Sequence, residues 1–153
     1  MGFFSRKKPT VPIGPPSDTW VVVRGAHNGN PLLARVRTQL GPVVGHSAYP
    51  FRVGVATRVL QGAADGMPSA EENATLLDIE DRLATALEAD RAAVFVVALT
   101  TNGVKEWVFY ASDPVAVKQR MDAFLPSVRT HQLQMVIAKD EDWVVYHQFQ
   151  NTK

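Results

Sequence analysis

Two neighbouring carboxylates, Glu80 and Asp81, lie in the clearest helical segment of the chain and are candidates for acid–base chemistry. Because successive side chains of a helix turn by about 100°, Glu80 falls near the edge of the apolar stripe and Asp81 faces water. A half-buried carboxylate at such an edge can have a raised pKa and act as an acid or a base. The alternative is a salt bridge with Arg58 or Lys105, or a charge at the rim of the core, and we favour this second interpretation.

Neither the histidines nor the acidic run forms a recognisable metal or catalytic motif. The chain has four histidines, His27, His46, His131 and His147. None belongs to an H-x-x-x-H or H-E-x-x-H pattern, so we expect surface or core-edge histidines. The three carboxylates from Asp140 to Asp142 could bind a hard cation, but acidic residues also suit a helix N-terminus, which we favour. We therefore expect no metal and no cofactor.

The bulk composition describes one ordinary globular domain. The chain has 153 residues, 46% of them hydrophobic and 20% charged, which suits a sizeable core. Its net charge is only +1, whereas a dedicated nucleic-acid-binding domain usually carries a clear basic excess. The absence of cysteine excludes disulfides, thiolate zinc sites and cysteine nucleophiles, and it suits a reducing compartment. We expect a cytoplasmic protein whose partner is not nucleic acid.

The first 19 residues are rich in proline, glycine and serine and predict a flexible arm, followed by a single α+β domain over residues 20–153. No apolar run is long enough to span a bilayer, and the start lacks the order of a signal peptide. Phe3 and Phe4, next to the basic residues 6–8, could make weak contact with an anionic membrane. A solvated tail is the simpler expectation.

Six apolar or alternating runs predict β-strands. They span residues 20–24, 32–40, 51–60, 91–101, 105–111 and 131–138. The run over residues 32–40 could also be a helix turn, and we favour the strand. Asn28-Gly29 and Asn102-Gly103 predict tight hairpin turns, because both residue types tolerate positive φ. The run over residues 91–101 is apolar on both faces, which indicates a strand that is covered on both sides.

Cap signals mark three helices. Ser69 and Glu72 have the spacing of a capping box, in which each side chain accepts from the other's backbone N–H, and the helix should cover residues 70–89. Asp113 before a proline predicts the start of a second helix, and Asp140 can cap a short third one. From residue 51 the order is strand, helix, strand, strand, helix, strand, which is the split βαβ arrangement of the ferredoxin-like fold.

We therefore predict an α+β protein with a ferredoxin-like core over about residues 51–138 and an N-terminal β-hairpin. Two right-handed βαβ units would place both longer helices on one face of an antiparallel sheet. In this layout we expect the strands on either side of Asn102-Gly103 to be separated at the centre of the sheet, or to pair directly only near the turn.

The strand after Asn102-Gly103 carries most of the aromatic candidates. Two sets alternate along it: Lys105, Trp107 and Phe109, and Glu106, Val108 and Tyr110. One set must face the helices and the other the open side of the sheet, and the sequence does not decide which. Exposed Trp107 and Phe109 would form a stacking platform for RNA bases. We favour burial in the core or in a dimer, because only Lys105 adds positive charge to this strand.

Five short motifs are spread along most of the chain. They are Tyr-Pro at residues 49–50, Gly-x-Pro at 66–68, L-x-x-I-E-D-x-L at 76–83, T-T-x-G-x-x-E-W-x-F-Y at 100–110 and D-x-x-W-x-x-Y at 140–146. Together they resemble an uncharacterised bacterial family that is known only as a domain of unknown function. The resemblance covers about two-thirds of the chain, residues 51–149, and implies no activity. That family is distantly similar to regulators of ribonuclease E activity of the B type, which implies a role in binding.

We predict a non-catalytic protein-binding or regulatory module that acts through a protein partner or through self-association. The candidate binding residues are Glu80, Lys105, Trp107, Phe109, Tyr110 and Trp143. One alternative is a small hydrolase that uses Glu80 with a histidine, which requires both groups in one cleft. The other is an RNA-binding module, which requires that the rings of Trp107 and Phe109 are exposed.

Overall fold

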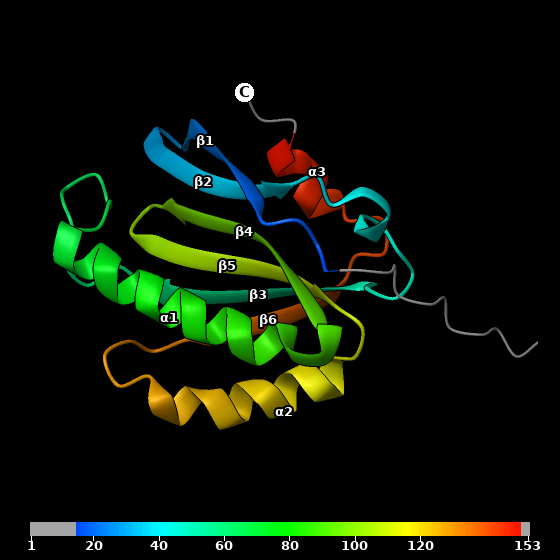
Figure 1. Cartoon of the computed structure of the whole chain (residues 1–153). Helices are drawn as coiled ribbons and strands as arrows, with labels where there is room; N and C mark the ends of the chain where they lie inside the picture. Colours follow the sequence, from blue (N-terminus) through cyan, green and yellow to red (C-terminus); the bar gives the residue numbers. More distant parts are fainter. Residues whose placement is uncertain (1–14, 151–153) are drawn as a thin grey trace, which may run out of the picture.

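The computed structural model describes residues 15–150, in which one antiparallel sheet is covered by helices on both faces (Figure 1). The strands are β1 (Thr19–His27), β2 (Asn30–Thr38), β3 (Phe51–Arg58), β4 (Ala93–Thr101), β5 (Val104–Ala111) and β6 (Gln134–Lys139). The helices are α1 (Ala70–Glu88), α2 (Pro114–Phe124) and α3 (Val144–Gln150). None of these helices is long and apolar enough to cross a membrane. The predicted membrane contact of Phe3 and Phe4 lies outside the described residues.

Within the described residues the six strands are ordered β1-β2-β4-β5-β3-β6, and every neighbouring pair is antiparallel. The predicted α+β class is therefore confirmed. The N-terminal hairpin of β1 and β2 extends the sheet, because β2 pairs with β4. This places β4 inside the sheet with neighbours on both sides, in agreement with its apolar sequence.

Side chains of the sheet pack into two separate cores. On one face, Val53, Phe95, Trp107 and Phe109 pack beneath α1 and α2. On the other face, a second core joins β2, β4 and β5 to α3 and to the segment over residues 40–49. The alternation along each strand assigns its residues to these two cores. The face that we expected to be open is therefore partly covered by α3 (Figure 1).

Both asparagine–glycine pairs form the predicted turns. Asn28 and Gly29 have φ values of 53° and 82°, and Asn102 and Gly103 have φ values of 53° and 73°. Two successive residues with positive φ are the geometry of the type I′ turn, whose twist matches that of a hairpin. The second turn keeps β4 and β5 paired from Thr101↔Val104 to Ala93↔Ala111, with one irregularity between residues 95 and 97. Our expectation that these strands are separated was wrong, because the two-residue turn sets a direct register along their whole length.

The capping box at the start of α1 is only half formed. The Ser69 hydroxyl accepts from the backbone N–H of Glu72 at 3.2 Å, as predicted. The Glu72 carboxylate does not return this bond but accepts from the backbone N–H of Leu60 and contacts His131 at 3.0 Å. A tertiary contact has therefore replaced the local bond. His131 is also buried, and β6 begins three residues later than the sequence predicts.

Candidate functional site

The six residues proposed from the sequence lie on both faces of the sheet and do not form one site. Glu80, Lys105, Trp107 and Phe109 belong to the face beneath α1 and α2, whereas Tyr110 and Trp143 belong to the opposite core. The rings of Trp107 and Phe109 have no exposed surface. Base stacking requires an accessible ring face, so the RNA platform that we considered on this strand is not formed.

Tyr110 and Trp143 build the core that closes the second face. Their rings stack with centroids 4.1 Å apart and 9° between planes, and the Tyr110 hydroxyl donates to Asp140 at 2.7 Å. Burial, together with this bond to a carboxylate, raises the pKa of Tyr110. Asp140 also accepts from the backbone N–H groups of Val144 and Val145, which is the predicted role of an acidic residue at a helix N-terminus. These contacts explain both residues as structural.

Glu80 is a buried ion-pair residue. Its Oε1 atom accepts from the indole N–H of Trp107 at 3.0 Å and pairs with the guanidinium of Arg35 on β2. The salt bridge that we favoured from the sequence is therefore present, but neither Arg58 nor Lys105 is the partner within ion-pair distance. The cavity that Glu80 lines contains no histidine among the described residues. The pairing that the hydrolase alternative requires is not formed.

Lys105 is the unusual member of this cluster. The residue is 6% exposed, yet its ammonium forms no hydrogen bond or ion pair with any residue of the described range. Burial lowers the pKa of Lys105, the nearby Arg35 charge lowers it further, and Glu80 acts in the opposite direction. Among the described residues, every side-chain nitrogen or oxygen atom that is fully buried has a hydrogen-bond partner. Because the Lys105 nitrogen has no such partner, it is not fully buried. The Lys105 ammonium therefore keeps contact with the cavity that the residue lines.

This cavity lies between α1 and the β1–β2 hairpin and has a volume of about 370 Å³. We call it the α1–hairpin groove. Its cationic residues are Arg24, Arg35 and Lys105, and its apolar residues include Val22, Leu33, Met67, Pro68 and Leu77. A neighbouring hollow of about 560 Å³ shares several of these residues and extends the groove toward the start of α1. A cavity that combines an apolar wall with a few polar groups is typical of small-molecule sites.

The charges in the groove do not balance. Arg35 is paired with Glu80, whereas Arg24 and Lys105 form no ion pair with a described residue. Two cations on one cavity without carboxylate partners create a positive potential inside a partly desolvated space. The groove is therefore suited electrostatically to an anion.

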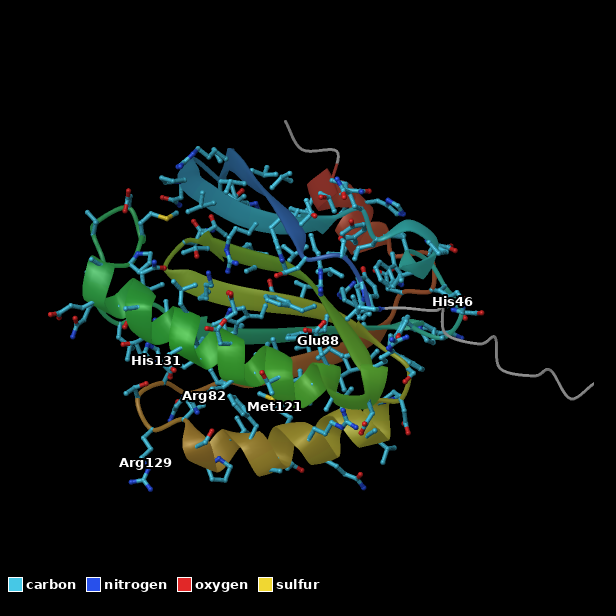
Figure 2. All side chains as sticks on the ribbon, viewed as in Figure 1. His46, Arg82, Glu88, Met121, Arg129 and His131 are labelled. Atoms are coloured by element: carbon cyan, nitrogen blue, oxygen red, sulfur yellow. The ribbon has the colours of Figure 1, made fainter. Side chains whose placement is uncertain are left out.

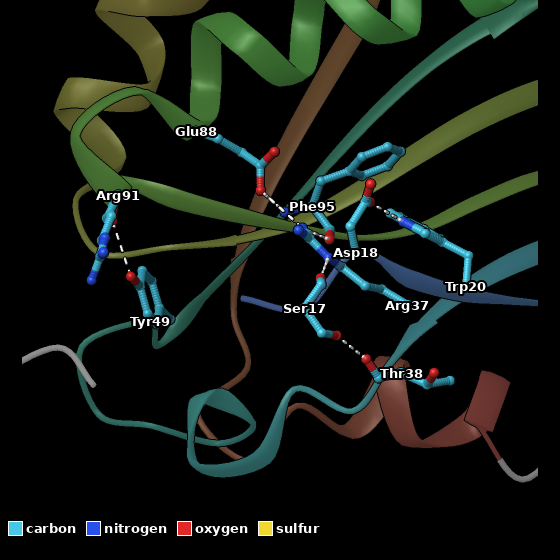
Figure 3. A network of polar contacts seen from close by, with 9 residues as sticks. All are labelled: Ser17, Asp18, Trp20, Arg37, Thr38, Tyr49, Glu88, Arg91 and Phe95. Atoms are coloured by element: carbon cyan, nitrogen blue, oxygen red, sulfur yellow. Dashed lines mark hydrogen bonds and ion pairs between the residues drawn. The ribbon is translucent and has the colours of Figure 1, made fainter. Parts of the chain in front are cut away.

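Beyond Glu80, the space between α1 and the hairpin is closed by a second ion pair (Figure 3). Arg37 on β2 bonds to Glu88 at 3.0 Å and to the carbonyl of Phe95 at 3.0 Å, and its Nε donates to the carbonyl of Ser17. The Arg35 and Arg37 guanidinium groups each lie 5.6 Å from the ring centroid of Trp20. These contacts fasten the hairpin to α1.

A second polar cluster surrounds His131, which lies in the segment between α2 and β6, close to α1 (Figure 2). One ring nitrogen contacts Glu72 at 3.0 Å and the other contacts the Thr130 hydroxyl at 2.8 Å. Although burial raises the pKa of Glu72, the bonds from His131 and from the backbone N–H groups of residues 60 and 61 lower it overall. Glu72 is therefore an anion that connects α1 to the loop after β3 and to the segment before β6. No group of three or more possible metal ligands occurs in the described part of the chain.

Sequence reasoning missed the arginines of the groove. Leu33, Arg35 and Arg37 alternate along β2, and Val22 and Arg24 alternate along β1, so the arginines share one face of the hairpin. This alternation was available as a signal. Only the pairing of β2 with β4 and the packing of α1 against β4, however, bring that face opposite Glu80 and Lys105.

Comparison with known proteins identifies one family. The model of a family of unknown function (DUF695) matches residues 18–150, which is nearly the whole described range. The resemblance to an uncharacterised family is thus confirmed, and the match carries neither an activity nor support for a similarity to regulators of ribonuclease E. No curated protein matches the chain.

Proposed function

We propose that this protein, which belongs to the family of unknown function DUF695, is a non-catalytic binding or regulatory module that holds a small anionic ligand in the α1–hairpin groove. The observation that carries this proposal is the buried Lys105 ammonium without a partner. An ammonium that loses hydration and gains no hydrogen bond is costly to the fold. A bound carboxylate or phosphate group would supply the missing partner.

The apolar wall indicates the rest of the ligand. Val22, Leu33, Met67 and Leu77 line the same cavity as Lys105, and Val22 and Leu77 are 59% and 38% exposed, respectively. A ligand that consists of an anionic group and a short hydrocarbon body would bury these side chains, gaining about 25 cal/mol for each Å² of apolar surface removed from water. We infer a small carboxylic acid with an aliphatic or aromatic body.

Binding of straight-chain carboxylates tests this proposal. We expect the affinity to rise from acetate to hexanoate, measured by calorimetry, and to be much weaker for alcohols of the same length. Lys105→Met should lower the affinity for hexanoate about tenfold or more, which corresponds to about 1.4 kcal/mol. Arg129→Gln is the matched control, because Arg129 is an exposed cation that does not line the groove. Equal affinity for acids and alcohols, or an unchanged affinity in Lys105→Met, would contradict the proposal.

Self-association or contact with a protein partner would pass on the effect of ligand binding. One exposed apolar surface favours self-association. Val104 on β5 and Val136 on β6 are 38% and 66% exposed, and the strand register places them on the sheet face that α3 covers only in part. A concentration series by light scattering tests self-association through this surface. We expect Val136→Lys to weaken a dimer. A monomer at every concentration would leave a separate protein as the partner.

A further inference from the structure

We propose that Lys105 forms a reversible imine with the carbonyl carbon of a 2-oxo acid bound in the α1–hairpin groove. This inference rests on the proposed function, because the carboxylate of the acid is held by the same cationic groove. It adds a covalent step to that function and narrows the ligand to acids that carry a carbonyl next to the carboxylate.

The first requirement for an imine is an amine that is accessible and not consumed by other contacts. Lys105 fulfils it, because its nitrogen makes no hydrogen bond or ion pair with a described residue and the residue lines the groove. The exposed lysines differ: Lys118 pairs with Asp122 at 3.2 Å, and Lys139 pairs with Glu141 at 3.2 Å.

The second requirement is a supply of neutral amine near neutral pH. Burial and the Arg35 charge both lower the pKa of Lys105, although the Glu80 carboxylate opposes them. A desolvated lysine beside other cations is a recognised route to an amine nucleophile.

The third requirement is a group that moves protons during dehydration. The amine adds to the carbonyl to form a carbinolamine, which then loses one water molecule to leave the C=N bond. Glu80 is close enough to Lys105 to act on its charge. Its Oε1 is occupied by Arg35 and Trp107, whereas no described residue donates to Oε2. That oxygen can accept a proton from the nitrogen and return it to the leaving hydroxyl group. The net reaction converts the amine and the ketone into an imine and one water molecule, and Glu80 ends in its starting protonation state.

The ligand must present its carboxylate and its carbonyl to different groups. Arg24 and Arg35 lie on neighbouring strands of the hairpin, while Lys105 lines the same cavity from β5. An acid whose carbonyl is adjacent to its carboxylate places the reacting carbon beside the anion-binding side chains. The apolar side chains of the groove would then hold the hydrocarbon part.

The experiment is reductive trapping of the full chain with pyruvate and borohydride near neutral pH. Borohydride reduces the imine to a secondary amine, which mass spectrometry of the digested protein assigns to a particular lysine. We expect one 1-carboxyethyl group on Lys105, and the yield of this adduct should be at least about tenfold higher at Lys105 than at Lys118 or Lys139. Trapping should extend to lower pH at Lys105 than at these two exposed lysines, and lactate, which lacks the carbonyl, should give no adduct.

Two variants separate chemistry from binding. Lys105→Arg keeps a cation but has no amine that can form an imine, so it should give no adduct at position 105, while hexanoate binding is measured on the native chain. Glu80→Gln should slow trapping at Lys105, and Glu71→Gln, an exposed change on the same helix, should not. Hexanoate binding without a Lys105 adduct would overturn the imine and leave the proposed function intact. If hexanoate does not bind and Lys105 forms no adduct, both the imine and the proposed function are wrong. Adducts spread equally over all lysines would overturn the imine alone.

Discussion

The Lys105 ammonium gives up most of its hydration on folding and gains no hydrogen bond from a described residue. Replacing a buried unpaired charge with an apolar side chain of similar length is often stabilising. We therefore predict that Lys105→Met raises the free energy of unfolding at neutral pH by about 1 kcal/mol. Urea unfolding of the two proteins measures the difference.

The same variant has a characteristic pH dependence. The pKa of Lys105 is lower in the folded than in the unfolded protein, so the unfolded state binds more protons between the two values. Stability from this residue therefore rises with pH through that window, and the advantage of Lys105→Met should shrink at alkaline pH. Lys118→Met, at an exposed position, should change little. A clear loss of stability in Lys105→Met would show that the lysine has a structural role.

Glu72 illustrates the opposite case, a buried charge whose bonds are complete. It accepts from the Leu60 backbone and from His131, and its removal leaves these donors without a partner. We predict that Glu72→Ala lowers the free energy of unfolding by about 3 kcal/mol. Glu71→Ala is the control, because Glu71 is exposed in the same first turn of the helix; similar losses in the two variants would contradict the role assigned to Glu72.

At the scale of elements, the loop before α1 holds the turn between β4 and β5. Gly66 has φ of +87°, and a Cβ atom there would lie 2.5 Å from the backbone nitrogen of Gly103. The backbone N–H of Val59 donates to the carbonyl of Gly103 at 2.9 Å. Since backbone atoms cannot move aside as a flexible side chain can, Gly66→Ala should cost about 2 kcal/mol or more.

Gly25→Ala provides the matched comparison for this loop. Gly25 lies in β1, and a Cβ atom there would meet nothing within 4 Å. We expect its replacement by alanine to be neutral or slightly stabilising. Thermal unfolding of both variants tests the contrast. Equal midpoint temperatures would show that the loop rearranges to accommodate a Cβ atom at position 66.

Local signals predicted most elements, whereas contacts between distant residues could not be predicted. The Asn102-Gly103 pair and the Ser69 cap act over two to three residues, so their chemistry is visible in the sequence. The Arg35–Glu80 and Glu72–His131 pairs join residues 45 and 59 positions apart. Their formation depends on sheet order and helix packing, which residue spacing does not encode. The half-formed capping box shows such a tertiary contact replacing a local one.

For the candidate site the same limit applies. Glu80 and Lys105 were proposed from the sequence, and the structure brings both to the α1–hairpin groove. Trp143 and Tyr110 were proposed with them, but they stack in the core on the other face. A strand that is buried on both sides gives no periodicity from which its faces can be told apart. Only the observed packing of α3 makes the distinction.

At the scale of the whole molecule, a buried carboxylate with a lowered pKa lies on each face of the sheet. Glu72 ties α1 to the segment before β6, and Asp140 ties α3 to Tyr110 on β5. Burial raises both pKa values, but the hydrogen bonds lower them overall, from 4.5 for Glu72 and from 3.8 for Asp140. A carboxylate whose folded pKa is depressed contributes stability above its unfolded pKa and loses that contribution as the pH falls through the folded value.

Acid should therefore unfold the protein by protonating both carboxylates. We predict a fall in the free energy of unfolding that begins near pH 4.5, the unfolded value for Glu72. Asp140→Asn and Glu72→Gln should each be less stable than the native chain at neutral pH and lose less on acidification. Because the two carboxylates share no partner, their effects should add within about 0.5 kcal/mol.

Urea unfolding of the native chain, both single variants and the double variant between neutral pH and about pH 3 measures these slopes. Asp122→Asn is the control, since Asp122 forms an exposed pair with Lys118. The double variant should have the flattest profile. If it kept the native slope, other carboxylates would carry the acid sensitivity. A strongly non-additive result would instead mean that the two sites interact in the folded protein, and β5 would carry this coupling because it contributes side chains to both cores.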